Sequence, residues 1–149
     1  MIQRKILFVC IHNSARSQMA EVFLNQLGGN ALIADSAGLE PGKLNPNVIK
    51  VMKEAGIDTS KNETKSVFDL FKQGKLYQAV ITVCDAASAE SCPIFPGVVK
   101  RMGWSFPDPS SFTGTPEEIL EKTRKVRDEI KETVAAFIEE AKHLHYWTK

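Results

Sequence analysis

The 149-residue sequence has few cysteines, almost no net charge and no long apolar run. Three cysteines are an odd number, which excludes a closed disulfide framework, and a core of this size does not need one. A formal net charge of +1 argues against a general nucleic-acid or acidic-membrane binder, because such a protein needs a basic face. The apolar runs are shorter than the roughly 20 residues of a membrane span, and the run 6–11 is too short for a secretory signal.

From these absences we expect a single domain over residues 1–149. The composition, 43% apolar and 25% charged, is that of an ordinary globular protein and shows neither disorder nor a linker. The cysteine count and the missing signal indicate a reducing, cytoplasmic location. A cytoplasmic cysteine is either an inert core residue or takes part in chemistry, so the positions of the three decide between these roles.

Strands and helices are predicted to alternate along the chain. Short apolar runs predict strands at 5–9, 31–37, 79–84 and 98–104. Helical spacing of apolar residues, with caps and stops, predicts helices at 16–27, 46–55, 66–71 and 116–141. This alternation is typical of parallel strands joined by right-handed crossovers, so we expect a three-layer α/β domain with its sheet flanked by helices.

Two finer expectations concern the first helix and the C-terminus. In the first helix, Leu27 belongs to the expected apolar face, and Glu21 and Asn25 belong to the opposite face. His143 and His145 fall in an expected frayed tail, where both are solvated and have no neighbours suited to binding a metal.

The segment between the first strand and the first helix carries the candidate site. In an open parallel sheet, ligands bind at the carboxyl ends of strands, and Cys10 stands at such an end. The five residues between Cys10 and Arg16 can curl so that backbone N–H groups point at one tetrahedral oxyanion. The predicted oxyanion-binding residues are Ile11, His12, Asn13, Ser14, Ala15, Arg16 and Ser17.

Cys10 is the candidate nucleophile of this loop. The helix dipole, the Arg16 guanidinium and a hydrogen bond from Ser17 all favour the thiolate, which is the reactive form. A thiolate inside an oxyanion cradle implies attack on the central atom of the bound anion. The alternative is that Cys10 is a buried core residue and Arg16 a surface cation, but their place between a strand and a helix favours chemistry.

Transfer of an oxyanion also requires an acid that protonates the leaving oxygen. Asp108 is the candidate, because its loop follows a strand and has aromatic residues and two prolines that restrict the backbone. The alternative for Asp108 is an ordinary turn aspartate. Weaker candidates for the acid are Asp35, Asp69 and Asp85.

These residues resemble a known family. The pattern Val9-Cys10-x5-Arg16-Ser17-Gln18-Met19-Ala20-Glu21, with a late Asp108-Pro109, is similar to the low-molecular-weight tyrosine phosphatase superfamily over nearly the whole chain. The resemblance implies a four-stranded parallel sheet flanked by helices. Phosphatases of this family usually have two tyrosines after the Asp-Pro, whereas Ser110-Ser111 follow here.

A second branch of the superfamily, the arsenate reductases, is the closer match. Its members have two further cysteines, and Cys84 and Cys92 stand at the end of the third predicted strand and in the loop after it. The spacing between them is one residue longer than in the best-known members. A phosphatase that forms a phosphocysteine on Cys10, or a non-catalytic anion sensor, remains the alternative.

The resemblance implies a disulfide relay. Cys10 attacks arsenate, Cys84 then attacks Cys10 and releases arsenite, and Cys92 attacks Cys84 to free Cys10. Thioredoxin or a similar dithiol would reduce the final disulfide, and phosphate would compete with arsenate. We expect a monomer with no tightly bound cofactor and no nucleic-acid or membrane partner. Some members bind potassium near the positions of Asn13, Glu21 and Ser36, but Ser66 replaces an expected aspartate, so we predict no metal.

Overall fold

The computed structural model describes residues 3–83 and 95–148. Its centre is a sheet of four parallel strands in the order β2-β1-β3-β4. The strands are β1 (Arg4–Cys10), β2 (Leu32–Gly38), β3 (Ala79–Thr82) and β4 (Lys100–Gly103). The parallel four-stranded sheet and the layered fold are therefore confirmed, with strand ends that differ by a few residues from the predicted ones.

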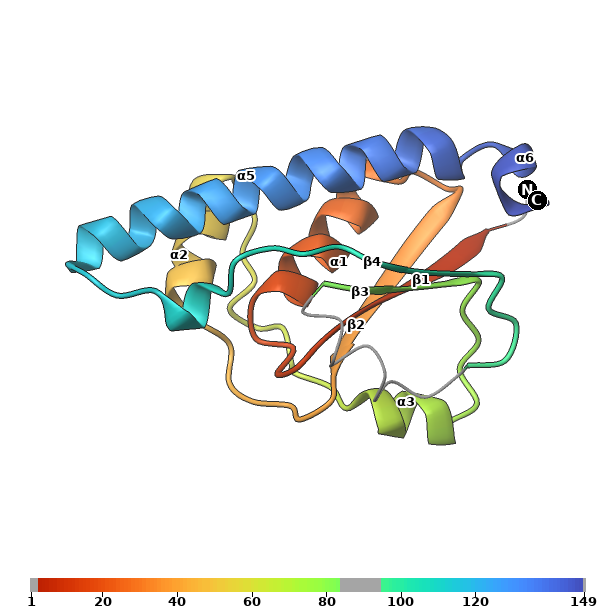
Figure 1. Ribbon diagram of the computed structural model, residues 1–149, viewed down its shortest axis with the longest axis horizontal. Helices are drawn as coiled ribbons and strands as arrows, with labels where there is room; N and C mark the ends of the chain where they lie inside the picture. The colour runs from red at the N-terminus through yellow and green to blue at the C-terminus, as the bar shows by residue number, and fades with distance from the viewer. Residues whose placement is uncertain (1–2, 84–94, 149) are drawn as a thin grey trace.

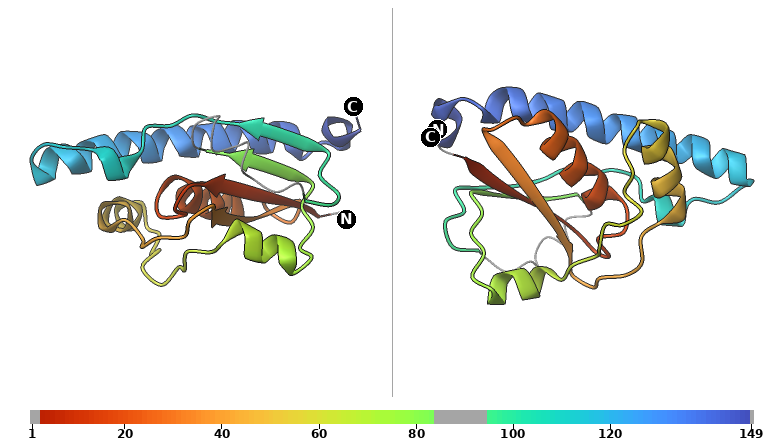
Figure 2. Two further views of the ribbon diagram at one scale, coloured as in Figure 1. Left: turned by 60° about the horizontal axis from the view of Figure 1, so that its bottom comes forward. Right: turned by 180° about the vertical axis from the view of Figure 1, so that it is seen from behind.

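Helices cover both faces of this sheet (Figures 1 and 2). They are α1 (Arg16–Leu27), α2 (Pro46–Glu54), α3 (Val67–Lys72), the 3₁₀ turn η1 (Pro109–Ser111), α5 (Pro116–Ala141) and α6 (Leu144–Trp147). Local signals explain where several begin. Asn45 caps α2, Ser66 caps α3, and Thr115 forms a capping box with Glu118 at the start of α5.

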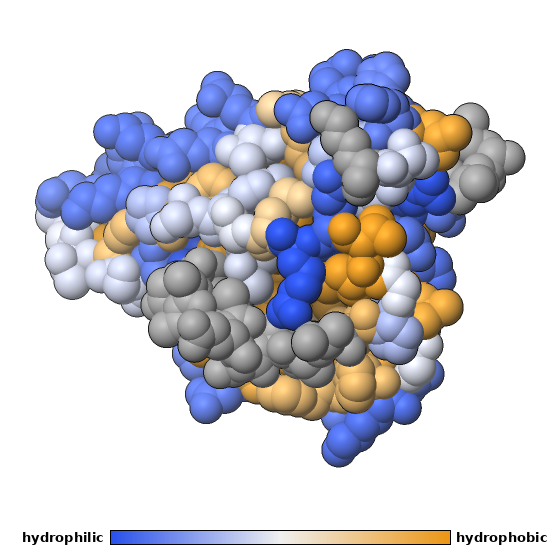
Figure 3. Space-filling view, turned by 45° about the vertical axis from the view of Figure 1, so that its right-hand side comes forward, coloured by the Kyte–Doolittle hydropathy of each residue, from blue (hydrophilic) through white to orange (hydrophobic). Residues whose placement is uncertain are grey.

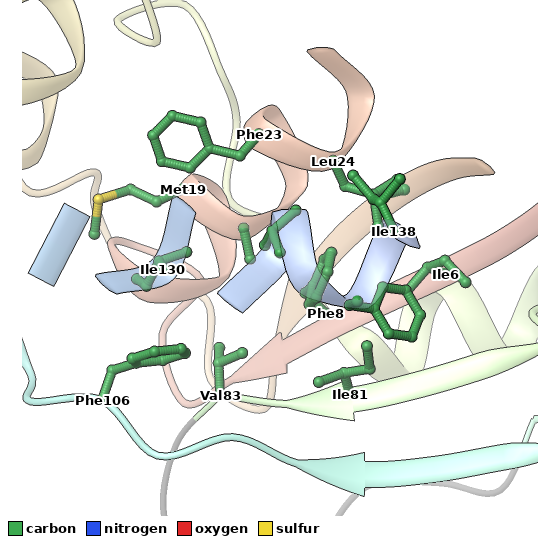
Figure 4. Close-up of a cluster of buried hydrophobic side chains, with 14 of the residues drawn as sticks. Ile6, Phe8, Met19, Phe23, Leu24, Ile81, Val83, Phe106, Ile130 and Ile138 are labelled. Atoms are coloured by element: carbon green, nitrogen blue, oxygen red, sulfur yellow. The ribbon is translucent and has the colours of Figure 1, made fainter. Parts of the chain in front are cut away.

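Alternate residues of β1 face the two sides of the sheet and divide the core. Ile6 and Phe8 belong to a cluster with residues of α1, α2 and α5, and the close-up shows them among labelled side chains of α1 and α5 (Figure 4). Leu7 and Val9 pack with α3 in a smaller cluster. All four side chains are fully buried, and each contributes roughly 1.5–3 kcal/mol by leaving water. Because both faces are covered, β1 is apolar throughout its second half, which is why no alternation is visible in its sequence.

Two expectations, about Leu27 and about the C-terminus, are wrong. Leu27 is 42% exposed, because it is the last residue of α1 and lies beyond the packed face. Asn25 is exposed as expected, and its side chain also exchanges two hydrogen bonds with the backbone of Ala34 in β2. The C-terminal residues form α6 rather than a frayed tail, since the buried Trp147 indole donates to Ala141 O at 2.6 Å.

The surface is mostly polar, with apolar groups in places. Figure 3 shows one face on which an apolar area is interrupted by hydrophilic residues. The exposed apolar side chains include Leu76, Val99 and Leu144, at 52%, 59% and 64% exposure. Among the helices of the described residues, none combines the length and the apolar character that crossing a bilayer requires.

Candidate oxyanion site

The loop from Cys10 to Ser17 is held from outside by the segment 39–45. Backbone N–H groups of that segment donate to the carbonyl oxygens of Cys10, Ile11, His12 and Ser14, at 2.7–3.1 Å. Within the described part of the chain, Asn13 is the one residue from 11 to 17 whose N–H donates to a protein atom. The loop therefore turns its carbonyls away and leaves a set of N–H groups without protein acceptors, the arrangement that binds oxyanions.

Two backbone features allow this tight curl. Gly38 ends β2 directly against the loop, and a side chain there would lie 2.7 Å from Ile11 O and 2.8 Å from Asn13 N. Asn13 has a φ of 55°, a left-handed conformation that asparagine adopts more readily than most residues. Both features bring the Asn13 N–H to 3.1 Å from Cys10 Sγ.

Cys10 lies at the bottom of this loop and is 2% exposed. Its Sγ is 2.9 Å from Ser17 Oγ, in addition to the contact with the Asn13 N–H. The predicted hydrogen bond between Ser17 and the nucleophile is thus present in the structure. The side chain of His12 contacts the segment after β2, with Nδ1 2.9 Å from Glu40 O, and binding of an oxyanion by its N–H stays a prediction.

Arg16 and Asp108 lie side by side although they are far apart in the sequence. Arg16 is 9% exposed, and it contacts Phe106 O at 3.3 Å and Asp108 Oδ2 at 3.7 Å. Asp108 also caps η1, because its Oδ1 accepts from Ser110 N at 3.0 Å. Its side chain is 40% exposed, so the carboxyl is open to solvent beside the anion loop.

The rival acids are less well placed. Asp35 accepts a 2.7 Å hydrogen bond from the Tyr77 hydroxyl, and burial together with this contact raises the pKa of Tyr77. Asp69 is exposed in the first turn of α3, on the opposite side of the sheet from α1. Asp85, Cys84 and Cys92 lie outside the described residues, so the roles expected of these three stay predictions.

Behind the loop lies a polar cluster that joins the positions considered for potassium to Lys65, a residue that sequence reasoning missed. Asn13, Ser17 and Ser36 are completely buried there, next to Glu21 and Lys65. The helical pattern places Glu21 on the outer face of α1, but its side chain is only 14% exposed and points to β2. Burial raises its pKa, and the charge of Lys65 acts in the opposite direction. The signal for this cluster in the sequence is Glu21, a glutamate shortly after the anion loop.

These polar residues do not fit a potassium site. Asn13 Oδ1 already accepts hydrogen bonds from Lys65 N at 2.9 Å and from Gln18 Nε2 at 3.1 Å. Glu21 Oε1 contacts the Lys65 ammonium at 3.4 Å, so its negative charge has a cation of its own. Nowhere in 3–83 and 95–148 do three or more His, Cys, Asp or Glu side chains gather as metal ligands would.

The loop surrounds a buried thiol with N–H groups that, apart from that of Asn13, have no acceptor in 3–83 and 95–148. Together with the adjacent arginine and the four-stranded parallel sheet, this loop defines a class of protein. The chain belongs to the low molecular weight phosphotyrosine protein phosphatase family, whose model matches residues 5–145. Its relatives include proteins named arsenate reductase. The one from Bacillus licheniformis is 43% identical over 141 residues, covering 93% of this chain and 98% of the other.

Solved structures agree with this placement. An arsenate reductase in the phosphate binding state has a TM-score of 0.75 and 32% identity, covering 93% of this chain and 99% of that one. A thioredoxin-dependent arsenate reductase of Corynebacterium glutamicum has a TM-score of 0.61 and 25% identity, covering 91% of this chain and 63% of that one. The predicted family and its reductase branch are confirmed.

Proposed function

We propose that this chain reduces arsenate to arsenite, with Cys10 as the nucleophile. The observation that carries the proposal is the Cys10 thiol with two hydrogen-bond partners inside a loop whose other N–H groups have no protein acceptor among the described residues. A tetrahedral oxyanion accepts such hydrogen bonds, and Arg16 neutralises part of its charge. The names of the relatives supply the choice of arsenate.

The first step forms a bond between Cys10 Sγ and arsenic. The thiolate attacks arsenate held by the loop, and one oxygen leaves as water once it has been protonated. Asp108 is the proposed acid, since its carboxyl lies at 3.7 Å from Arg16 and is accessible. In this step Arg16 binds the anion and also holds the Asp108 carboxyl in position.

The second step transfers two electrons to arsenic. Cys84 thiolate attacks Cys10 Sγ, the electron pair of the sulfur–arsenic bond stays on arsenic, and arsenite departs from a Cys10–Cys84 disulfide. One described contact supports this pairing. Val83 N donates to Val9 O at 2.9 Å, so the residue before Cys84 lies beside the end of β1 that carries Cys10.

The third step returns Cys10 to its thiolate form. Cys92 attacks Cys84 and forms a Cys84–Cys92 disulfide, which an external dithiol reduces. Thioredoxin is the proposed dithiol, because one structural neighbour is a thioredoxin-dependent arsenate reductase by name. Phosphate is the proposed competitor of arsenate, because another neighbour is in a phosphate binding state and the two anions share shape and charge.

The deciding experiment supplies thioredoxin, its reductase and NADPH, and measures arsenate-dependent consumption of NADPH. We expect sustained turnover, and free thiols should fall by two per chain when arsenate is added without reductant. Brisk hydrolysis of an aryl phosphate with no arsenate turnover and no thiol loss would instead establish the phosphatase. Slow phosphate hydrolysis beside arsenate turnover is compatible with the proposal, because the same loop binds phosphate.

A further inference from the structure

A continuous path of polar contacts leads from Lys65 to the nucleophile. Lys65 Nζ lies 3.4 Å from Glu21 Oε1, and Ser36 Oγ lies 3.2 Å from the same oxygen. Asn13 Nδ2 contacts Ser36 Oγ at 2.9 Å and Ser17 Oγ at 2.8 Å. Ser17 Oγ in turn contacts Cys10 Sγ at 2.9 Å. The proposed function uses the last contact but gives no role to the buried glutamate or its lysine.

The orientation of the Asn13 amide is fixed by a backbone group. The N–H of Lys65 can only donate, and it lies 2.9 Å from Asn13 Oδ1. The Gln18 amide nitrogen donates to the same oxygen at 3.1 Å. The Asn13 amide nitrogen must therefore face the two serine hydroxyls, and it donates one hydrogen to each.

The two serines then have defined donor directions. Ser36 accepts from Asn13, and an ionised Glu21 can only accept, so the Ser36 hydroxyl donates to Glu21. Ser17 also accepts from Asn13, which leaves its own hydrogen to donate to Cys10 Sγ. Together with the Asn13 N–H, Ser17 gives the sulfur two donors, which stabilise a thiolate more than a thiol.

The ionisation of Glu21 affects how firmly the Asn13 amide is held. An ionised Glu21 accepts from Ser36 and makes the Ser36 oxygen a stronger acceptor for Asn13, whereas a protonated Glu21 could donate to Ser36 and share that oxygen with Asn13. Burial raises the pKa of Glu21, while Lys65, by its charge and its hydrogen bond, works to lower it. Lys65 is itself only partly buried, so its ammonium keeps its hydration on one side.

We propose that Lys65 is a positioning residue for Cys10: its ammonium pairs with Glu21 and so, through Ser36, strengthens the hold on the Asn13 amide that directs the Ser17 hydrogen to the sulfur. The inference rests on the proposed function only in taking Cys10 as the nucleophile. Next to Asn13, Glu21 and Ser36, which do not fit a metal ion, the positive charge that faces Glu21 is the Lys65 ammonium. It acts from behind the loop and touches no substrate.

The test measures the reactivity of Cys10 without arsenate. Iodoacetamide alkylation of Cys10, located by peptide mass spectrometry, is followed from acid to alkaline pH, and the midpoint of the rate reports the thiolate. In Lys65→Met we expect the midpoint to rise by at least about half a pH unit. Lys65→Arg should restore it, because the guanidinium can pair with Glu21.

The control is Lys61→Met, which removes the same charge from an exposed position earlier in the same segment. Its alkylation midpoint should stay at the wild-type value. Among the described residues, the other titratable groups around the site include His12, Arg16 and Asp108 at the loop and Asp35 beside Ser36, and all of them stay unchanged in these variants. A shift confined to Lys65→Met therefore isolates the path from general charge effects.

Three outcomes would overturn the proposal. The first is an unchanged midpoint in folded Lys65→Met, and the second is an equal shift in Lys61→Met. If Lys65→Met does not fold, Ser36→Ala decides, because it keeps the ion pair and interrupts the path. We expect the same rise there, and no rise is the third contrary outcome. If the alkylation midpoints shift as expected but the protein does not turn over arsenate, the proposed function is wrong and the role of Lys65 is still supported.

Discussion

At the scale of single residues, the proposed mechanism assigns the attack to Cys10 and oxyanion binding to the loop around it. Cys10→Ser keeps a small hydrogen-bonding side chain but replaces the sulfur by a much weaker nucleophile. We expect arsenate turnover to fall below detection while phosphate binding, measured by titration calorimetry, stays within a few-fold of wild type. Residual turnover would show that a group other than Cys10 attacks arsenate. Loss of binding would show that the introduced hydroxyl disturbs the loop, and Cys10→Ala would then serve as the second measurement.

The ion pair behind the loop predicts a pH dependence of stability. The folded protein raises the pKa of Glu21, so the contribution of this group is fully present below its ordinary pKa and is lost as pH rises through the folded value. In Lys65→Met the lysine no longer lowers the pKa of Glu21, so the free energy of unfolding falls further at neutral pH. We expect a destabilisation that is larger near pH 7.5 than near pH 4 by on the order of 1 kcal/mol.

Urea unfolding of wild type, Lys65→Met and Lys61→Met at both pH values checks this. Lys61 is exposed, so its substitution should change stability by the same small amount at each pH. A destabilisation of Lys65→Met that does not vary with pH would mean that Glu21 does not respond to the lysine.

At the scale of elements, the loop takes its shape from the end of β2 and the segment after it. Gly38→Ala places a Cβ 2.7–2.9 Å from backbone atoms of Ile11, Asn13 and His12, none of which can move without opening the loop. We expect a loss of about 1–3 kcal/mol in unfolding free energy and weaker phosphate binding. Gly42→Ala is the matched control, because its nearest contact is a side-chain atom of His12 at 3.4 Å. Equal effects of the two variants would contradict the close approach.

The helices and strands could be predicted from the sequence, whereas the contacts between them could not. The β1 strand and the Thr115-capped α5 carry local signals, namely an apolar run and a capping box with proline. Cys10 and Arg16 lie on one loop, so their proximity follows from their spacing. The Lys65–Glu21 pair joins the middle of α1 to the segment before α3, between residues 44 apart, and no local pattern encodes such a pairing.

Helix amphipathicity misplaced Glu21, and it gave no sign of the backbone partners of Asn25, which is exposed as expected. On a periodicity argument a polar residue faces solvent, but in a three-layer fold the same side of α1 meets the edge strand β2. There both residues find polar partners, Asn25 in the backbone of Ala34 and Glu21 in Ser36. A buried polar side chain is stable when it is hydrogen-bonded, and only the tertiary structure shows those bonds.

At the scale of the whole molecule, the sheet order relates the anion loop to the rest of the proposed relay. β1 and β3 are adjacent and parallel, with Val9 paired to Thr82, so both strands leave the sheet at the same edge. Chain segments that follow them therefore begin close together, which is what successive thiol exchange requires. A relay of this kind needs no second domain, because one small sheet brings both strand ends together.

This arrangement predicts the behaviour of Cys92→Ala. Cys10 and Cys84 remain, so arsenate is still reduced once, but no third thiol frees Cys10 from the resulting disulfide. We expect at most one arsenite per chain, with a Cys10–Cys84 disulfide found by non-reducing peptide mapping. Cys84→Ala is the matched control: it should release no arsenite, because nothing attacks the sulfur–arsenic bond. Sustained turnover of Cys92→Ala would show that the reductant attacks the Cys10 disulfide directly, and the relay would then end at Cys84.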